Sequence, residues 1–230
     1  MSSELISIVV PVYNEERFVE PLLRKVAQLA GEQEILVIDD GSTDQTPAIL
    51  ARLAQALPIR VMTHPANLGK GAAIRTGLKV ARGTTIIIQD ADLEYDPQDY
   101  PGLLRPVLQG RTSIVYGSRF LGPHRAIYFW HRLGNWVLAN MVNLLFNASL
   151  SDVETGYKVF RRKVLDDISL RANGFDVEVE FTCKALKAGY MIVEVPIAYY
   201  GRTYAEGKKI TWKDGVTALL TIIRCRLNLY

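Results

Sequence analysis

Two aspartates, Asp90 and Asp92, directly follow a short apolar run at residues 84–89 that predicts a buried β-strand. In an extended segment, residues two apart share a face, so these two carboxylates can act together. Paired carboxylate oxygens suit Mg²⁺ or Mn²⁺, which keep some waters and also bind substrate phosphates. The alternative is a polar loop without a ligand, because a D-x-D pattern also arises by chance.

The remaining charge is unevenly distributed along the chain. Further carboxylates cluster where the early strands are expected to end: Asp39, Asp40, Asp44, Glu94, Asp96 and Asp99. Residues 101–150 contain no Asp, Glu or Lys, but they contain Arg105, Arg111, Arg119, Arg125 and Arg132, with His124 and His131. Guanidinium groups without acidic neighbours favour a phosphate or carboxylate ligand, because Arg offers paired planar donors. An ordinary basic surface is the alternative.

A second basic group lies around a loop between Gly201 and Gly207, and consists of Arg202, Lys208, Lys209 and Lys213. Glycines beside cations favour a loop that closes over an anion, and an ordinary surface loop is the alternative. One half of the chain therefore offers metal ligands and the other offers anion ligands. A metal-bound nucleotide and a second phosphorylated molecule would satisfy both.

The elements that must position these side chains alternate between short apolar strands and helices. Strands are expected at residues 5–12, 34–38, 59–63, 84–89, 113–116 and 191–195, the last extended by residues 196–202. Helices are expected at residues 17–29, from 46 onward, at 72–81, 126–146 and 212–228, and residues 174–180 are expected to lead into a further helix that ends at about residue 188. This order predicts an α/β fold with a mainly parallel sheet, in which ligands bind at the carboxyl ends of the strands.

Composition limits the class of protein. The 230 residues, 49% hydrophobic and 22% charged, fit one folded domain, with a nucleotide and metal half at about 1–100 and an acceptor half at about 101–230. A net charge of +3 argues against nucleic-acid binding. Cys183 and Cys225 form no metal or redox spacing, so we expect reduced thiols and a cytoplasmic location. The N-terminus lacks the features of a signal peptide.

Two segments, residues 127–146 and 216–229, are rich in apolar and aromatic side chains, but each contains Arg or Asn. They are expected to lie on a membrane surface and not to cross it, which would place the protein peripherally on the cytoplasmic face. The alternative is that both are core helices packed on the sheet. We expect this alternative for many of these side chains, which include Tyr128, Phe129, Trp130, Trp136, Leu138, Leu144, Leu145 and Phe146.

Several motifs together resemble those of family 2 glycosyltransferases, which have the GT-A fold (a Rossmann-like central sheet flanked by helices). They are Val9-Val10-Pro11-Val12-Tyr13-Asn14-Glu15, Val37-Ile38-Asp39-Asp40-Gly41-Ser42-Thr43-Asp44, Asn67-Leu68-Gly69-Lys70-Gly71 and Asp90-Ala91-Asp92. Later motifs resemble the branch of dolichol-phosphate mannose synthases and bacterial polyprenyl-phosphate glycosyltransferases: Gly117-Ser118-Arg119, Glu154-Thr155-Gly156-Tyr157-Lys158 and the segment from Gly201 to Lys209. The resemblance covers nearly the whole chain.

The resemblance implies a role for each matching residue. Pro11, Val12, Tyr13 and Glu15 would line the base and ribose pocket, Asp39 or Asp40 would bond to the base, and Lys70 and Gly71 would lie near the nucleotide. Asp90, Ala91 and Asp92 would contact the metal and the diphosphate. Glu94 stands where the mannose synthases use a Gln metal ligand, so it would be a third metal ligand, but one that adds negative charge. The acceptor phosphate would be held by Arg119, His131, Arg132, Asn135 and Arg202, with Lys208 or Lys209.

The implied reaction is an inverting, metal-dependent transfer of mannose or glucose from a GDP- or UDP-sugar to a polyprenyl or dolichyl phosphate, with Asp92, Arg119 and Arg202 nearest the chemistry. A phosphate nucleophile is already ionised near neutral pH, so it needs no strong base. The alternative is a soluble acceptor, and a soluble hydroxyl would need a carboxylate base, for which Asp152, Glu154, Glu178 and Glu180 are candidates. A nucleotide-sugar-binding module without catalysis is a third interpretation. The sequence leaves the base, the hexose, the choice of Mg²⁺ or Mn²⁺ and the oligomeric state open, a homo-oligomer included.

Overall fold

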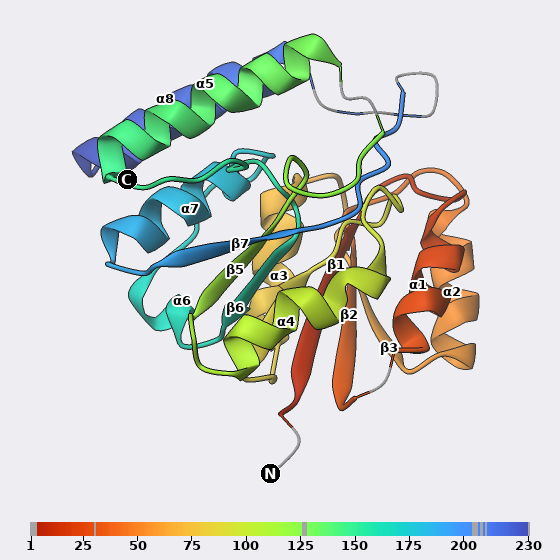
Figure 1. Ribbon diagram of the computed structural model, residues 1–230. Coiled ribbons are helices and arrows are strands. Elements are labelled where there is room, and N and C mark those ends of the chain that lie inside the picture. The colour runs from red at the N-terminus through yellow and green to blue at the C-terminus, as the bar shows by residue number, and fades with distance from the viewer. Residues whose placement is uncertain are drawn as a thin grey trace.

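The sheet of this protein has seven strands in the order β3-β2-β1-β4-β6-β5-β7 (Figure 1). The computed structural model describes residues 4–29, 31–125, 128–203, 207, 209 and 211–229. Within them the strands are β1 (Ile6–Val12), β2 (Gln33–Asp39), β3 (Ile59–Thr63), β4 (Thr85–Ile88), β5 (Ile114–Ser118), β6 (Lys158–Arg161) and β7 (Ile192–Pro196). Only β6 runs antiparallel to its neighbours among these strands. The predicted α/β fold with a mainly parallel sheet is confirmed.

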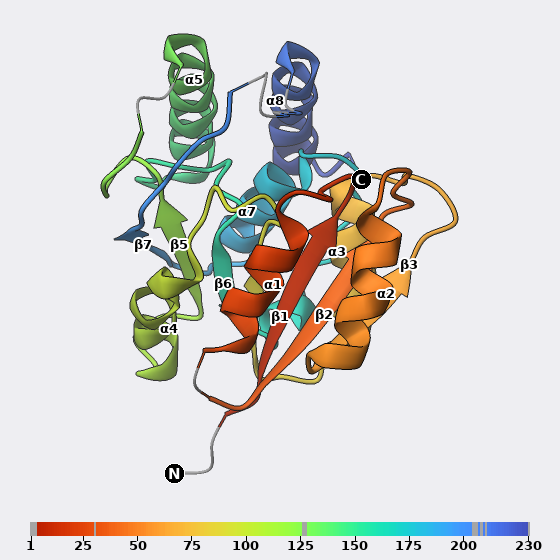
Figure 2. The same cartoon turned by 90° about the vertical axis from the view of Figure 1, so that its right-hand side faces the viewer.

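Helices cover both faces of the sheet (Figure 2). One apolar cluster joins the sheet to α1 (Val19–Ala27), α2 (Thr46–Ala56) and α4 (Tyr100–Leu108). A second cluster, on the other face, includes α3 (Lys70–Val80), α6 (Val164–Asp167) and α7 (Val177–Lys187). The remaining pair, α5 (Phe129–Phe146) and α8 (Trp212–Leu227), lies beyond α7 and forms a third cluster with it (Figure 1).

The apolar strand residues alternate between the two faces of the sheet, as the two-residue repeat of a strand requires. On β1, Ile8 and Val10 belong to the first cluster, whereas Val9 belongs to the second. All three side chains are fully buried. The continuous apolar run of β1 is therefore explained by helices on both faces, which is typical of parallel sheets.

The β6 strand, the α4 helix and the short α6 helix were not predicted from the sequence. The β6 strand lies between β4 and β5, with Ile86 of β4 opposite Phe160. The α4 helix forms although Pro106 lies inside it, and it buries Tyr100, Leu103 and Val107 against the sheet. Proline is a poor residue for a helix interior, so tertiary burial outweighs local propensity here.

The helix predicted at residues 126–146 begins at Phe129 in the structure, and Ala126 and Ile127 lie outside the described residues. Its side chains divide between the two expected environments. Leu138 is buried in the core, whereas Trp136 and Leu144 are 61% and 84% exposed. No helix in the described part of the chain is long and apolar enough to cross a membrane.

The start of α3 packs closely on a loop before α7. The amides of Gly71 and Ala72 donate to the carbonyl of Asn173, at 2.7 and 3.3 Å. A Cβ added at Gly71 would lie 2.3 Å from the carbonyl oxygen of Ala172. Gly71 is therefore required for close backbone packing, and this packing fixes the position of Lys70 beside it.

We predict that Gly71→Ala lowers the free energy of unfolding by about 1–3 kcal/mol, because the loop must move away from the new methyl group. Urea denaturation measures this change. Gly102→Ala, on α4, is the matched control, because no atom lies within 4 Å of the added Cβ. The control should leave stability unchanged or raise it by up to about 1 kcal/mol. Equal stabilities of the two variants would contradict the packing role of Gly71.

Candidate active site

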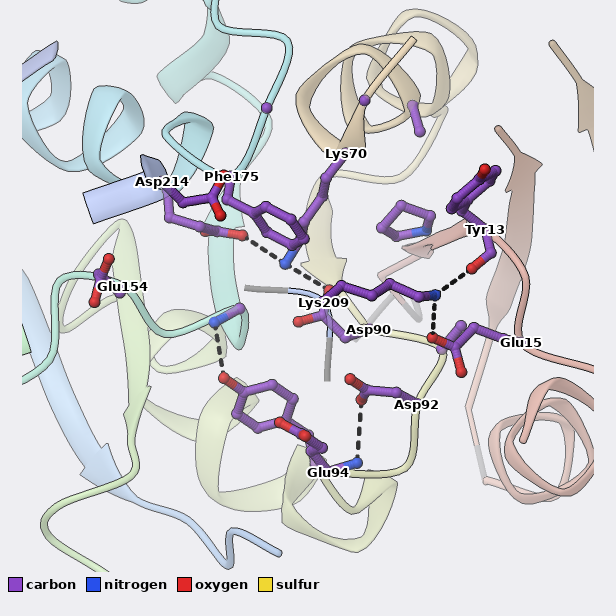
Figure 3. Close-up of a pocket in the computed structure, with 18 of the residues that line it drawn as sticks. Tyr13, Glu15, Lys70, Asp90, Asp92, Glu94, Glu154, Phe175, Lys209 and Asp214 are labelled. Carbon is purple, nitrogen blue, oxygen red and sulfur yellow. Dashed lines mark hydrogen bonds and ion pairs between the residues drawn. The ribbon is translucent and has the colours of Figure 1, made fainter. Parts of the chain in front are cut away.

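A cavity of about 480 Å³ lies at the carboxyl ends of the central strands (Figure 3). Fourteen of the residues that the resemblance assigns to the donor, the metal or the acceptor line it: Pro11, Val12, Tyr13, Glu15, Asp40, Lys70, Asp90, Ala91, Asp92, Glu94, Arg119, His131, Arg202 and Lys209. They come from both halves of the chain, so the fold gathers the predicted donor and acceptor residues around one space.

Four of the residues assigned to the donor, the metal or the acceptor do not line this cavity, and a fifth, Lys208, lies outside the described residues. Asp39 is buried behind it, and Gly71 serves backbone packing. Arg132 is exposed on α5. Asn135 is buried and donates to the carbonyl oxygen of Ser151 at 2.9 Å, which ties α5 to the loop before β6.

Asp90 follows β4 and begins a row of alternating charges whose first two members, Asp90 and Lys70, are partly buried and whose others are buried. Its carboxylate lies 2.6 Å from the ammonium of Lys70, which is also 2.9 Å from Glu178. Glu178 in turn lies 2.6 Å from the ammonium of Lys158 on β6. Figure 3 shows the Lys70 side chain reaching from α3 to Asp90. The row links β4, α3, α7 and β6 directly under the cavity.

The pKa values along this row follow from burial and from the paired charges. Burial alone would lower the pKa of Lys70, but the carboxylates of Asp90 and Glu178 outweigh burial and raise it. Burial likewise would raise the pKa of Glu178, but the two lysines lower it. For Lys158, burial dominates and lowers the pKa despite its partner Glu178. Lys70 is therefore a firmly protonated cation beside Asp90.

Asp92 is paired with a cation from the far end of the chain. The guanidinium of Arg202 lies 2.8 Å from Asp92, 3.0 Å from Glu15 and 3.4 Å from Glu94. Lys209 adds a second cation, 2.6 Å from Glu15. Burial, with the nearby charges of Glu94 and Asp90, raises the pKa of Asp92 to about 7 although Arg202 opposes this. Negative charge therefore remains in excess around Asp92.

This excess of carboxylates suits a divalent cation. Within the described residues no three His, Cys, Asp or Glu side chains converge on one point that could hold a metal. Both oxygens of Glu94 are engaged, one by Arg202 and the other by the Tyr199 hydroxyl at 2.7 Å. Both oxygens of Asp92 are engaged as well, by the Glu94 amide at 3.1 Å and by Arg202 at 2.8 Å, so a cation would compete with Arg202 for Asp92. Asp90 and Asp92 lie together on the cavity wall, and Mg²⁺ needs only one or two protein carboxylates when substrate phosphates supply further oxygens.

Asp39 and Asp40 differ in what their oxygens bind. Asp40 accepts from Leu68 N and Gly69 N, at 3.0 and 2.7 Å, and pairs with His64 at 2.7 Å. It therefore organises the loop that leads into α3. Asp39 accepts from Ser42 N at 3.0 Å through one oxygen, and its buried Oδ2 has no hydrogen-bond partner in the described structure. Of the two aspartates, Asp39 therefore keeps one carboxylate oxygen that is free to accept a hydrogen bond.

Arg119 has an acidic partner that its local sequence does not show. Its Nε and one terminal nitrogen donate to the two oxygens of Asp152, each at 2.7 Å. The Asp152 side chain is fully buried. Asp152 lies just after residues 101–150, the span without Asp, Glu or Lys. The expectation that the arginines of this span lack acidic partners is therefore wrong for Arg119. The guanidinium still lines the cavity, held in place by this bidentate pair.

The four candidate bases have different environments. Asp152 is paired with Arg119, and Glu178 lies between two lysines. Glu180 accepts from the amides of residues 171 and 172 and does not line the cavity. Glu154 lines the cavity, and no hydrogen bond or ion pair joins its carboxylate to another described residue (Figure 3). Burial raises the pKa of Glu154, which Arg119 only partly opposes.

Several lining residues were not identified from the sequence. Phe175 and Asp214 lie across the cavity from Asp92 (Figure 3), and Tyr95 lies between the rings of Tyr157 and Tyr199, 4.9 and 5.5 Å from them. Phe175 follows a glycine just before a helix, and this position was a usable signal. The tyrosines are distant in sequence, and nothing local indicates that they meet.

Comparison with known proteins agrees with this geometry. Residues 7–169 match the family model described as glycosyl transferase family 2. The chain is 32% identical over 211 residues to polyprenol monophosphomannose synthase of Mycolicibacterium smegmatis, covering 87% of this chain and 79% of that protein. It is 28% identical to dolichol-phosphate mannosyltransferase of Pyrococcus furiosus, covering 88% of this chain and 58% of that protein.

Among solved structures, glucosyl-3-phosphoglycerate synthase from Mycobacterium tuberculosis has a similar fold. The complex with Mn²⁺, UDP-glucose and phosphoglyceric acid matches with a TM-score of 0.76 and 22% identity, over 97% of this chain and 80% of that one. This likeness confirms the predicted GT-A fold. From the family match and the sequence identities, the chain belongs to glycosyl transferase family 2 and is a hexosyltransferase of the dolichol-phosphate mannose synthase-like branch.

Proposed function

We propose that this enzyme transfers a hexose, mannose or glucose, from a GDP- or UDP-sugar to the phosphate of a polyprenyl phosphate, with inversion at the anomeric carbon. The observation that carries the proposal is the single cavity in which Asp90 and Asp92 lie on one wall with Arg119, His131 and Arg202 around it. The sequence relatives named for polyprenol and dolichol phosphate support this acceptor class.

On the donor side, Asp90 and Asp92 would hold Mg²⁺ or Mn²⁺ against the diphosphate. The bound cation would neutralise the charge that develops on the leaving phosphate. Lys70 orients the Asp90 side chain through its 2.6 Å ion pair. Tyr13 and Glu15 would line the nucleoside pocket. A hydrogen bond from the base would be accepted by Asp40, which lines the cavity, or by Asp39, which has a free oxygen but is buried directly behind the cavity.

On the acceptor side, the nucleophile would be an ionised phosphate oxygen, so the residues have to position the phosphate and need not remove a proton. Arg119 is held by two hydrogen bonds to Asp152 and lines the cavity, with one terminal nitrogen outside that bidentate pair. Arg202 lies beside Asp92, where the two substrates would meet. The arginines would thereby hold the acceptor phosphate close to the anomeric carbon.

We predict that Asp92→Asn lowers kcat by at least about 100-fold, since the loss of a carboxylate ligand weakens charge stabilisation at the leaving group. EDTA should abolish activity, and added Mg²⁺ or Mn²⁺ should restore it. The thermal unfolding midpoint should not fall, because the change relieves repulsion among clustered carboxylates. Asp166→Asn, at an exposed position on α6, is the control with unchanged activity. Full activity of Asp92→Asn, or full activity in EDTA, would exclude the proposal.

A second candidate function is favoured by Glu154. An unengaged carboxylate in the cavity, with a raised pKa, could act as the general base for a hydroxyl acceptor. The structural relative that was solved with phosphoglyceric acid is named for a soluble phosphorylated acceptor. The two candidates therefore differ in whether Glu154 is needed.

Glu154→Gln separates these candidates. With a polyprenyl-phosphate acceptor, we predict that kcat changes by less than about tenfold, because no proton has to be removed from the nucleophile. A hydroxyl acceptor would instead require the base, and its loss would cost about 100-fold or more. Radiolabelled UDP- and GDP-sugars, tested with a short polyprenyl phosphate and with phosphoglyceric acid, measure transfer into the lipid and aqueous phases. Product only in the aqueous phase would contradict the lipid acceptor.

A further inference from the structure

The α5 and α8 helices form a pair that stands apart from the sheet and packs on α7 (Figures 1 and 2). Each helix buries one stripe of small and aliphatic side chains in the third apolar cluster. On α5 the stripe includes Leu138 and Val142, and on α8 it includes Ala218 and Ile222. This packing buries one side of each helix, and the other side is exposed to solvent.

The opposite side of each helix is also apolar. On α8 the exposed positions recur every three or four residues, and on α5 they form a similar stripe. We call these residues the outer face: Phe129, Trp130, Leu133, Trp136, Val137 and Leu144 on α5, and Trp212, Val216, Leu220, Ile223 and Leu227 on α8. The three tryptophans of the chain all belong to it, at 61–77% exposure. So large an apolar surface marks an interaction site.

The exposed charge around the outer face is mainly positive. Arg132 on α5 and Lys213, Arg224 and Arg226 on α8 are exposed, and α5 contains no acidic residue. The one acidic residue of α8, Asp214, accepts from Thr211 N at 2.7 Å as part of a helix capping box. Apolar and aromatic side chains with flanking cations are the features of helices that lie in the interface of an anionic bilayer.

The cavity reaches this helix pair. His131 of α5, with Asp214 and Ala218 of α8, lines the cavity, so the beginnings of both helices border it. Trp130 and Trp212 lie at the same ends of the two helices. Tryptophan side chains favour the headgroup region of a membrane. The aromatic end of the outer face therefore lies where a lipid phosphate would enter the cavity.

We propose that the outer face binds the surface of an anionic phospholipid bilayer, with both helices in the interface and the cavity open toward the headgroups. This inference rests on the proposed function, because it explains how the cavity meets a lipid-bound acceptor. A second copy of the chain is a less suitable occupant: a twofold interface pairs the same patch with itself and would bring the positive faces together.

Vesicle binding by the full chain tests the inference. With vesicles of mixed phosphatidylglycerol and phosphatidylcholine, the tryptophan emission should shift to shorter wavelength and the protein should float with the vesicles. The double variant Leu144→Ser/Leu220→Ser keeps all three tryptophans as reporters and lies outside the cavity lining. It should bind at least about tenfold more weakly, because two leucines no longer enter the bilayer. Arg224→Gln should weaken binding by about fivefold in low salt.

Leu108→Ser is the matched control, since it also removes an exposed leucine, which is 44% exposed. Leu108 belongs to α4, and this helix lies far from the α5 and α8 pair (Figure 1). It should bind vesicles like the parent protein. Equal binding by the double variant, equal affinity for vesicles of phosphatidylcholine alone, or concentration-dependent dimerisation without vesicle binding would overturn the inference.

Transfer assays distinguish this inference from the proposed function. With a short, water-soluble prenyl phosphate, the double variant should retain the parent rate, whereas transfer to a long-chain acceptor in vesicles should fall at least about tenfold. If the protein transfers to the soluble prenyl phosphate but binds no vesicles, the inferred membrane binding of the outer face is wrong and the proposed function stands. Vesicle binding without transfer to any prenyl phosphate would overturn the function alone.

Discussion

The neutralisation of carboxylates at one edge of the sheet is the constraint on which the rest of this structure depends. Glu15, Asp90 and Asp92 follow the ends of β1 and β4, and Glu178 approaches from α7. Charges buried at this depth are tolerated only when they are paired. Lys70, Lys158, Arg202 and Lys209 supply the pairing from α3, β6 and the segment after β7. Each of these elements must therefore be in place for the site to exist.

The same pairing joins the two ends of the chain. Arg202 bonds to Glu15, which lies 187 residues earlier, and Tyr199 bonds to Glu94. A segment that the motifs assign to the acceptor is thus held by carboxylates that the motifs assign to the donor. Because the cations and the predicted metal would compete for Asp92, donor binding and the position of Arg202 would be coupled through charge. The ordered binding of two anionic substrates would have a direct physical basis in this coupling.

The sequence predicted whatever is encoded locally. The strands β1, β2 and β4 are short, apolar and bounded by polar turns, and the D-x-D motif follows one of them directly. Partners that meet only in the fold were missed. Asp152 lies 33 residues from Arg119, and no local pattern pairs them. The α4 helix contains Pro106, so its local sequence has a low helix propensity. It is stabilised by the burial of its apolar side chains, which the local sequence does not reveal. Lys158 was noted only as part of a motif, and its burial next to Glu178 depends on the position of β6 in the sheet.

The α5 helix shows why its environment could not be decided from the sequence. A helix with apolar residues on one side packs on a core, and periodicity reveals that side. Here Leu138 and Val142 pack in the core. Trp136 and Leu144 belong to a second, exposed apolar side, whose residues also recur with the helical repeat. A helix that is apolar on two sides needs two apolar surroundings, and α7 and α8 supply one of them. A bilayer as the second would place a phosphate-binding cavity at the depth where a prenyl chain presents its phosphate. The apolar surface and the arginine-lined cavity would then serve one acceptor, each binding a different end of it.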